Sequence, residues 1–217
     1  MSDFAVARDL MIEGQVKPNR ATDPRLLAAL RAIPREAFVP ASLKAVAYVD
    51  EDIKIAPGRH LMEPRVLSRL IQALEVGADD LTLDIGGGSG YSAAVLSKLA
   101  GAVVAVEEDA GLAAQAEQLL AGQGCDNAVV VCGPLAQGCP SQGPYDAIFI
   151  NGAVEEAPEA LLQQLKEGGR LAAVVMANGV GKAMLYLKSH GVVGRRELFD
   201  ASVPPLPGFA LPKKFVF

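Results

Sequence analysis

The densest group of residues that could do chemistry is a run of glycines between two acids. Asp84 opens the segment Asp84-Ile-Gly-Gly-Gly-Ser-Gly90, whose glycines allow a tight turn and let a ligand approach the backbone. A helix starting just after this segment would offer free N–H groups and the positive end of its dipole. Glu107 lies 21 residues after Gly86. At the end of a neighbouring strand, its carboxylate could accept both hydroxyls of an adenosine ribose.

The spacing of these glycines separates two kinds of nucleotide cofactor. A dinucleotide fingerprint requires glycine at position 91, where this chain has Tyr91. S-adenosylmethionine (SAM) has an ammonium group and a ribose but no phosphate, so it needs a close backbone and carboxylates instead. The pattern therefore favours SAM, bound by Asp84, Gly86, Gly88 and Glu107. An NAD site and a turn that serves packing alone are the alternatives.

Strands and helices alternate around this segment, which predicts an α/β fold. The apolar strand runs show no in/out alternation, as expected when both faces of a sheet are covered. Strands separated by helices indicate a doubly wound, mostly parallel sheet. Together with the SAM-type glycine pattern, we expect this sheet to be of the SAM-dependent methyltransferase (Rossmann-like) type. We expect strands over 81–85, 102–106, 128–132, 146–150 and 170–175, and helices over 91–99, 110–121 and 158–165.

The first 62 residues differ from the rest and are expected to form a cap. Asp23-Pro24 predicts the start of a helix, with Asp23 as its N-cap and an apolar stripe that ends before Pro34. A second helix is expected from Pro64. We expect one domain over 1–217, with a cap region (1–62) and a cofactor-binding core (63–217). The core would end in edge strands after a turn at Leu206-Pro-Gly208, the last being Phe215-Val-Phe217.

Composition excludes several function classes. The 217 residues are 51% hydrophobic and 21% charged, so the chain can bury a core. A net charge of −5 without a basic cluster disfavours nucleic acid. The longest uncharged stretch (127–145) is interrupted by glycines and prolines, and the N-terminus lacks a signal-peptide pattern, so we expect a cytoplasmic protein without membrane contact. Three cysteines without a CxxC pair predict free thiols and no metal site.

The chain resembles the protein-L-isoaspartate O-methyltransferase family from about residue 10 to about residue 175. The resemblance implies a SAM-binding sheet beside an N-terminal helical cap. It implies transfer of the SAM methyl group to the α-carboxylate of L-isoaspartyl residues in damaged proteins or peptides, which leaves S-adenosylhomocysteine. We expect a monomer. The motifs that carry the resemblance are Met11-Ile-Glu-Gly-Gln15, Thr22-Asp-Pro-Arg-Leu26, Ile33-Pro-Arg-Glu-Ala-Phe-Val-Pro40, Ala47-Tyr48, Leu83-Asp-Ile-Gly-Gly-Gly-Ser-Gly-Tyr91, Val106-Glu107, Pro144-Tyr-Asp-Ala-Ile148, Leu165 and Gly168-Gly-Arg-Leu171.

Two segments depart from the family pattern. The family has a G-x-(Q/A)-T-I-S-x-P-like segment whose serine lies at the substrate carboxylate, but here Met62 takes the serine position and His60 the threonine position. No catalytic residue is therefore assigned, and the substrate-facing candidates are Arg59, His60 and Met62. Arg59, His60 or the nearby Arg65 could bind a carboxylate instead, whereas Met62 is expected to pack in the interior.

The second departure concerns the adenine. The family has Gly-Asp-Gly where this chain has Gly133-Pro-Leu135. The family's aspartate reaches the adenine amino group, and Pro134 has no side-chain acceptor. We therefore expect apolar and backbone contacts from Gly133 and Leu135.

Methyl transfer to a carboxylate makes few demands on side chains. An acid with a reference pKa near 4 is already ionised at pH 7 and needs no general base. Loss of one hydroxyl hydrogen bond to a charged group costs about 1.5–3 kcal/mol, which weakens the reaction without abolishing it. Three hypotheses remain: an isoaspartyl methyltransferase, a SAM-dependent methyltransferase with another acceptor, and a non-catalytic SAM-binding protein.

Overall fold

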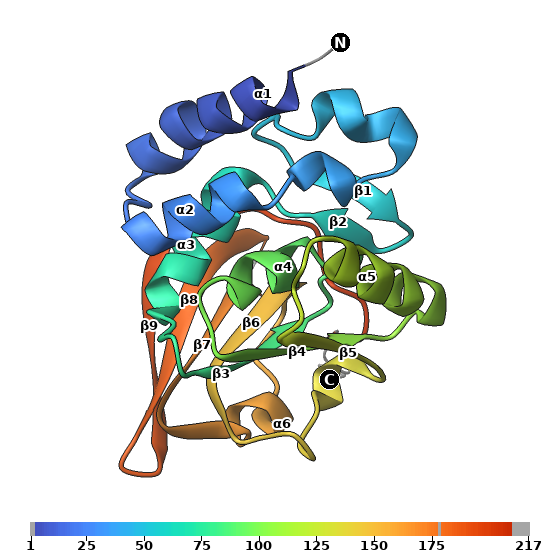
Figure 1. Cartoon of the computed structure of the whole chain (residues 1–217). Coiled ribbons are helices and arrows are strands. Elements are labelled where there is room, and N and C mark those ends of the chain that lie inside the picture. Colours follow the sequence, from blue (N-terminus) through green and yellow to red (C-terminus); the bar gives the residue numbers. More distant parts are fainter. Residues whose placement is uncertain (1–2, 178, 210–217) are drawn as a thin grey trace, which may run out of the picture.

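The computed structural model describes residues 3–177 and 179–209, which form an α/β fold (Figure 1). Its central sheet has seven strands in the order β5-β4-β3-β6-β7-β8-β9. The first five of these are parallel, and β8 and β9 complete the sheet as an antiparallel hairpin. The strands are β3 (Leu81–Ile85), β4 (Ala102–Glu107), β5 (Ala128–Cys132), β6 (Tyr145–Val154), β7 (Leu165–Ala177), β8 (Val180–Ser189) and β9 (Val192–Asp200). The predicted doubly wound, mostly parallel sheet is confirmed.

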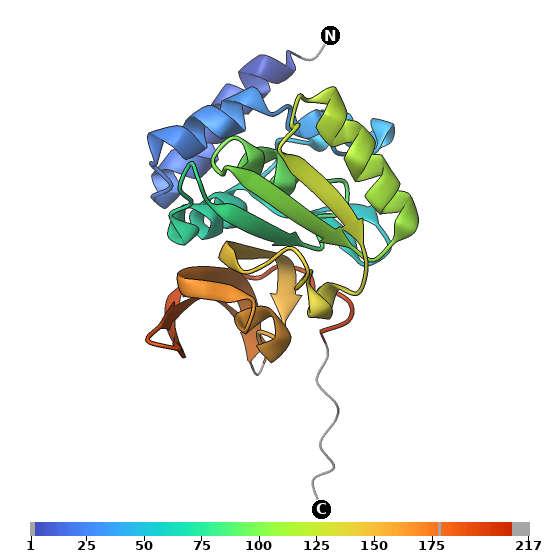
Figure 2. The same cartoon turned by 60° about the horizontal axis from the view of Figure 1, so that its bottom comes forward.

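Helices cover both faces of this sheet. Figures 1 and 2 show α3, α4, α5 and the N-terminal helices on one side and α6 on the other. Neighbouring strand residues alternate between two buried cores, with Val103 in the core under the N-terminal helices and Val104 in the core under α6. Because both faces are buried at the centre of the sheet, β4 is apolar up to Glu107 at its end and β3 is apolar apart from Thr82 and Asp84. The helices are α3 (Pro64–Leu74), α4 (Tyr91–Ser97), α5 (Ala110–Gly122) and α6 (Glu159–Leu162).

The N-terminal region packs on this sheet through helices and a small hairpin. It consists of α1 (Phe4–Met11), further helical turns over 12–19, α2 (Pro24–Ala32), two short 3₁₀ segments, and the hairpin of β1 (Ile53–Ala56) and β2 (Arg59–Leu61). The Asp23 carboxylate caps α2 by accepting a 2.8 Å hydrogen bond from the Arg25 amide, as its sequence predicted. The predicted helix from Pro64 is also present. The sequence did not predict α1.

Several boundaries differ from expectation. The helix expected over 158–165 spans only four residues as α6, because β7 already begins at Leu165. The edge of the sheet is formed by β8 and β9, which were not predicted individually. Just before the predicted turn at Leu206-Pro-Gly208, Pro205 forms a parallel bridge with Ala153 of β6. The predicted strand at Phe215–Phe217 lies outside the described residues.

Three further features bear on function. Among residues 3–177 and 179–209, no helix is both long and apolar enough to span a membrane. The same residues contain no group of three or more His, Cys, Asp or Glu side chains placed to hold a metal ion. Cys125 and Cys139 are buried and Cys132 is exposed, all as free thiols.

Candidate cofactor and acceptor site

The glycine-rich loop joins β3 to α4 at the carboxyl edge of the sheet. Gly86 and Gly88 have φ angles of 70° and 58°, in the left-handed region that favours glycine. The Gly86 amide donates a 2.9 Å hydrogen bond to the carbonyl of Val106, which fixes the loop against β4. A methyl group on Gly88 would lie 2.7 Å from the Ile55 side chain of β1. The loop backbone is thus packed closely between β4 on one side and Ile55 of β1 on the other.

Asp84 lies at the start of this loop with its side chain fully buried. Its carboxylate accepts hydrogen bonds from the Ser92 hydroxyl (2.7 Å) and from the Asn151 amide (2.5 Å). Burial raises the pKa of Asp84 to about 7, while these two hydrogen bonds oppose the shift. Asp84 is therefore a buried carboxylate that changes charge near neutral pH, at the position expected for the cofactor ammonium.

Glu107 ends β4 and is also buried. Its carboxylate accepts backbone hydrogen bonds from Gly88, Glu108 and Asp109. It also forms a bidentate ion pair with Arg59, in which the Nε–Oε2 distance is 2.9 Å and the Nη2–Oε1 distance is 2.8 Å. Arg59 was predicted as a substrate-facing residue. The structure instead places its guanidinium on the carboxylate expected to bind the ribose.

The loop predicted to hold adenine follows β5 at the same edge. The Gly133 amide donates to the carbonyl of Glu107, so this loop lies beside Glu107. Leu135 is buried, and its side chain lies 3.3 Å from where a methyl group on Gly86 would be. Pro134 is exposed. The structure therefore brings Gly133 and Leu135 together with Gly86 and Glu107.

The acceptor segment follows β2, where Met62 is buried and His60 is partly exposed. Both line a small cavity of about 10 Å³ together with Asp52 and Asn151. Burial raises the pKa of Asp52 to about 6, and burial with the nearby Lys54 lowers the pKa of His60 below its usual 6.5. Near pH 7 the cavity therefore presents a carboxylate and a neutral imidazole.

Buried polar contacts fix these segments to the N-terminal region. The fully buried Arg35, from the Pro-Arg-Glu-Ala-Phe-Val-Pro motif, donates hydrogen bonds to the carbonyls of Ala47 (2.7 Å) and Met62 (2.8 Å). The Ser89 hydroxyl of the glycine-rich loop donates to the carbonyl of Phe38. The motif thus positions both the acceptor segment and the cofactor loop.

The C-terminal segment packs against the glycine-rich loop through Leu206. The Leu206 amide and the Ala153 carbonyl form a 2.8 Å hydrogen bond, which holds the segment along the end of β6. A methyl group on Gly86 would lie 2.9 Å from both terminal carbons of Leu206. Leu206 therefore lies against the glycine-rich loop, and Arg59 lies against Glu107.

The backbone and carboxylates of this site fit SAM. The left-handed glycines place no side chain on the loop, and Asp84 and Glu107 are buried acids on adjacent parallel strands. Sequence reasoning missed Ser92, Asn151 and Leu206, because none of them belongs to the glycine motif and two of them are distant in the chain.

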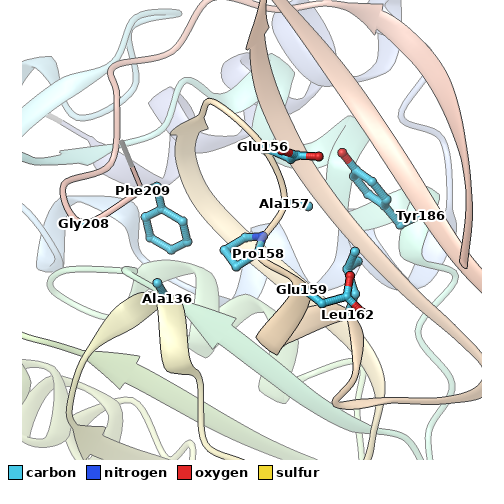
Figure 3. Close-up of a pocket in the computed structure, with 9 residues that line it drawn as sticks. All are labelled: Ala136, Glu156, Ala157, Pro158, Glu159, Leu162, Tyr186, Gly208 and Phe209. Atoms are coloured by element: carbon cyan, nitrogen blue, oxygen red, sulfur yellow. The ribbon is translucent and has the colours of Figure 1, made fainter. Parts of the chain in front are cut away.

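The pocket in Figure 3 lies elsewhere. It has a volume of about 390 Å³ and lies between α6, the C-terminal segment and β8. Phe209 and Tyr186 stand on opposite sides of it, with Glu156 near the Tyr186 hydroxyl (Figure 3). Its lining includes neither the glycine-rich loop nor the predicted acceptor residues.

Comparisons with known proteins agree with the sequence motifs and the fold. The model of the protein-L-isoaspartate(D-aspartate) O-methyltransferase family matches residues 7–202. A protein-L-isoaspartate O-methyltransferase of Methanoculleus marisnigri is 39% identical, over 93% of this chain and 91% of that protein. One from Rhodopseudomonas palustris is 38% identical, over 91% of this chain and 92% of that protein.

Solved structures give the same fold. A structure titled protein-L-isoaspartate O-methyltransferase aligns with a TM-score of 0.81 at 24% identity, covering 95% of this chain and 67% of that one. A Plasmodium falciparum structure titled as the same kind of enzyme, in complex with S-adenosyl-L-homocysteine, aligns with a TM-score of 0.79 at 19% identity, covering 96% of this chain and 100% of that one. From the family model and the curated relatives, the chain belongs to the protein-L-isoaspartate(D-aspartate) O-methyltransferase family.

Proposed function

We propose that this chain is a SAM-dependent protein carboxyl methyltransferase acting on L-isoaspartyl residues of damaged proteins or peptides. One observation carries the proposal: a chain of this family places two buried carboxylates, Asp84 and Glu107, beside a left-handed glycine loop. Damaged cytoplasmic proteins are the proposed substrates, and the chain acts as a monomer.

The residues of the chain bind and orient the reactants. Backbone groups at Gly86 and Gly88 receive the cofactor, Asp84 its ammonium group and Glu107 its ribose hydroxyls. Gly133 and Leu135 contact the adenine, since they lie beside Glu107 and Gly86.

When bound, SAM supplies a methyl group on a positively charged sulfur. The new bond would join a carboxylate oxygen to the methyl carbon, and the electron pair of the broken S–C bond would stay on sulfur. The acceptor carboxylate is already ionised, so the protein supplies alignment and a dry pocket rather than a base.

Met62 supports a second candidate, a methyltransferase with a different acceptor. It is buried and lines the acceptor cavity, where the family has a hydroxyl donor. An apolar side chain at this point changes which acceptors the cavity favours. The chemistry of the cofactor loop is the same in both cases.

The Arg59–Glu107 ion pair supports a third candidate, a family member without catalysis. Glu107 already has all its oxygens in hydrogen bonds, so cofactor binding competes with an internal partner. A chain in which Arg59 never leaves Glu107 would bind no SAM.

Methyl incorporation from radiolabelled SAM distinguishes these candidates. We expect labelling of an isoaspartyl peptide and none of the matched aspartyl peptide. Labelling confined to proteins in a cell extract would favour another acceptor. No labelling, together with no binding of SAM or S-adenosylhomocysteine by calorimetric titration, would refute enzymatic function.

A further inference from the structure

The Arg59–Glu107 ion pair is the most deeply buried one in the described part of the chain. The side chains are 6% and 3% exposed, and both guanidinium nitrogens that face Glu107 contact its oxygens at 2.8–3.1 Å. Three backbone amides donate to the same carboxylate. Hydrogen-bond capacity at Glu107 is therefore filled from within the protein.

In this pair, Arg59 occupies the Glu107 carboxylate, which the proposed function assigns to the ribose hydroxyls. A ribose presents two hydroxyl donors, as the guanidinium does, so the two compete for the same oxygens. If Arg59 leaves, Glu107 keeps its three backbone donors and the carboxylate remains stabilised. An exchange of partners is thus possible without leaving a buried carboxylate unpaired.

The small cavity lined by Asp52, His60 and Met62, here called the acceptor cavity, has no cationic residue among the described residues of its lining, although Arg35 and Arg65 act on Asp52 from outside it. Asp52 contributes a negative charge, and His60 is neutral near pH 7. Met62 donates no hydrogen bond. Arg59 lies in β2 between Gly58 and His60, which both line the cavity, and its Nη1 donates to the Gly58 carbonyl. A guanidinium released from Glu107 therefore remains tethered beside the cavity.

We propose that Arg59 is an exchangeable positioning residue: it holds Glu107 in the cofactor-free chain, and the ribose displaces it toward the carboxylate of the acceptor. The guanidinium would then supply the interaction that the missing serine hydroxyl does not. This inference rests on the proposed function, because it requires the ribose at Glu107. It makes binding ordered, with the cofactor first and the acceptor carboxylate second.

The first test measures binding of S-adenosylhomocysteine by calorimetric titration. We expect Arg59→Gln to bind at least tenfold more tightly than the unmodified chain, because the ion pair no longer competes. Arg31→Gln, which removes an exposed arginine paired with Asp9 and Glu13, is the matched control and should leave the affinity unchanged. Equal or weaker binding by Arg59→Gln would overturn the competition.

The second test measures binding of a fluorescent isoaspartyl peptide with and without saturating S-adenosylhomocysteine. In the unmodified chain we expect the cofactor product to strengthen peptide binding about tenfold, and we expect this coupling to vanish in Arg59→Gln. The same peptide with its α-carboxylate amidated should show no coupling in either protein. Coupling that persists in Arg59→Gln, or with the amidated peptide, would overturn the role of Arg59 at the acceptor.

Two controls keep these outcomes separate. Thermal unfolding shows whether Arg59→Gln is folded, and Arg59→Lys, which keeps the charge but loses the bidentate geometry, should also bind S-adenosylhomocysteine more tightly than the unmodified chain. If neither the unmodified chain nor any folded Arg59 variant binds S-adenosylhomocysteine, the proposed function fails. If all bind it equally, the cofactor assignment survives and only the exchange fails.

Discussion

The hydroxyl of Ser89, inside the glycine-rich loop, donates a 2.6 Å hydrogen bond to the main-chain carbonyl of Phe38 in the N-terminal region. The two residues are 51 positions apart, and both are buried. A single buried hydrogen bond thus connects the cofactor loop to the motif that also carries Arg35.

We expect Ser89→Ala to lower the free energy of unfolding by about 1–3 kcal/mol, because it leaves the Phe38 carbonyl buried without a partner. It should also weaken binding of S-adenosylhomocysteine, since the loop loses its anchor. Urea unfolding and calorimetric titration measure the two effects. Ser97→Ala is the matched control: the Ser97 hydroxyl donates to the Ala94 carbonyl of its own helix, so its loss should leave cofactor affinity unchanged. Equal cofactor affinities in both variants would contradict the anchoring role.

Gly86→Ala should abolish cofactor binding and lower the free energy of unfolding by about 1–3 kcal/mol. The new methyl group would meet Leu206 at 2.9 Å, and φ of 70° is strained for alanine. Gly122→Ala, at the end of α5 with open space around it, serves as the control and should change stability by less than about 1 kcal/mol. A Gly86→Ala protein that binds S-adenosylhomocysteine normally would remove this loop from the cofactor site.

Cofactor affinity should rise about tenfold between pH 6 and pH 8. The pKa of Asp84 is about 7, so its carboxylate becomes the charged partner of the cofactor ammonium only as pH rises through neutrality. Calorimetric titrations of S-adenosylhomocysteine across this range measure the effect. Asp84→Asn should bind S-adenosylhomocysteine more weakly and lose the pH dependence of the affinity. If the affinity of that variant changes with pH as in the unmodified chain, another group causes the pH dependence.

The raised pKa of Asp84 makes the free energy of unfolding fall with rising pH, whereas it makes cofactor affinity rise. Because the pKa in the folded chain is above the reference value of 3.8, the folded state holds more protons than the unfolded state between pH 4 and pH 7. The contribution of Asp84 to the free energy of unfolding therefore falls as pH rises through this window. Asp52, with a pKa of about 6, contributes with the same sign. Urea unfolding of Asp84→Asn should show a shallower decline with pH than the unmodified chain.

Met62→Ser should raise turnover on an isoaspartyl peptide about tenfold at saturating SAM, since a hydrogen bond to a charged group is worth about 1.5 kcal/mol or more. The buried site loses apolar volume, so the free energy of unfolding should fall by about 1–3 kcal/mol. Met11→Ser, at a buried position in α1, provides a control with loss of stability but no gain in turnover. No gain from Met62→Ser, with cofactor binding intact, would favour a different acceptor.

Local sequence signals predicted the central fold well. Apolar runs at 81–85, 102–106 and 128–132 became β3, β4 and β5 almost residue for residue. For β3 and β4 the reason is that strands buried on both faces have little freedom in composition. The β8–β9 hairpin was missed because its strands mix charged and apolar residues. Its turn did carry a signal: His190-Gly191 has positive φ at both positions, as a two-residue hairpin turn requires.

The cofactor motif was readable because it depends on a continuous segment. The partner of Glu107 was not, since Arg59 lies 48 positions away and its own neighbours in the chain suggested an acceptor role. The cover of Leu206 over Gly86 likewise depends on how the C-terminal segment crosses β6. Contacts of this kind are set by the packing of distant elements, which no local pattern specifies.

The position of β9 at the end of the sheet has a consequence for self-association. An edge strand exposes unpaired backbone groups that can recruit another strand. On β9 the exposed Arg195, Arg196 and Glu197 follow one another, and Lys182 of β8 pairs with Glu197. Bringing a second copy against this edge would desolvate those charges, so the sheet ends in a strand that resists aggregation.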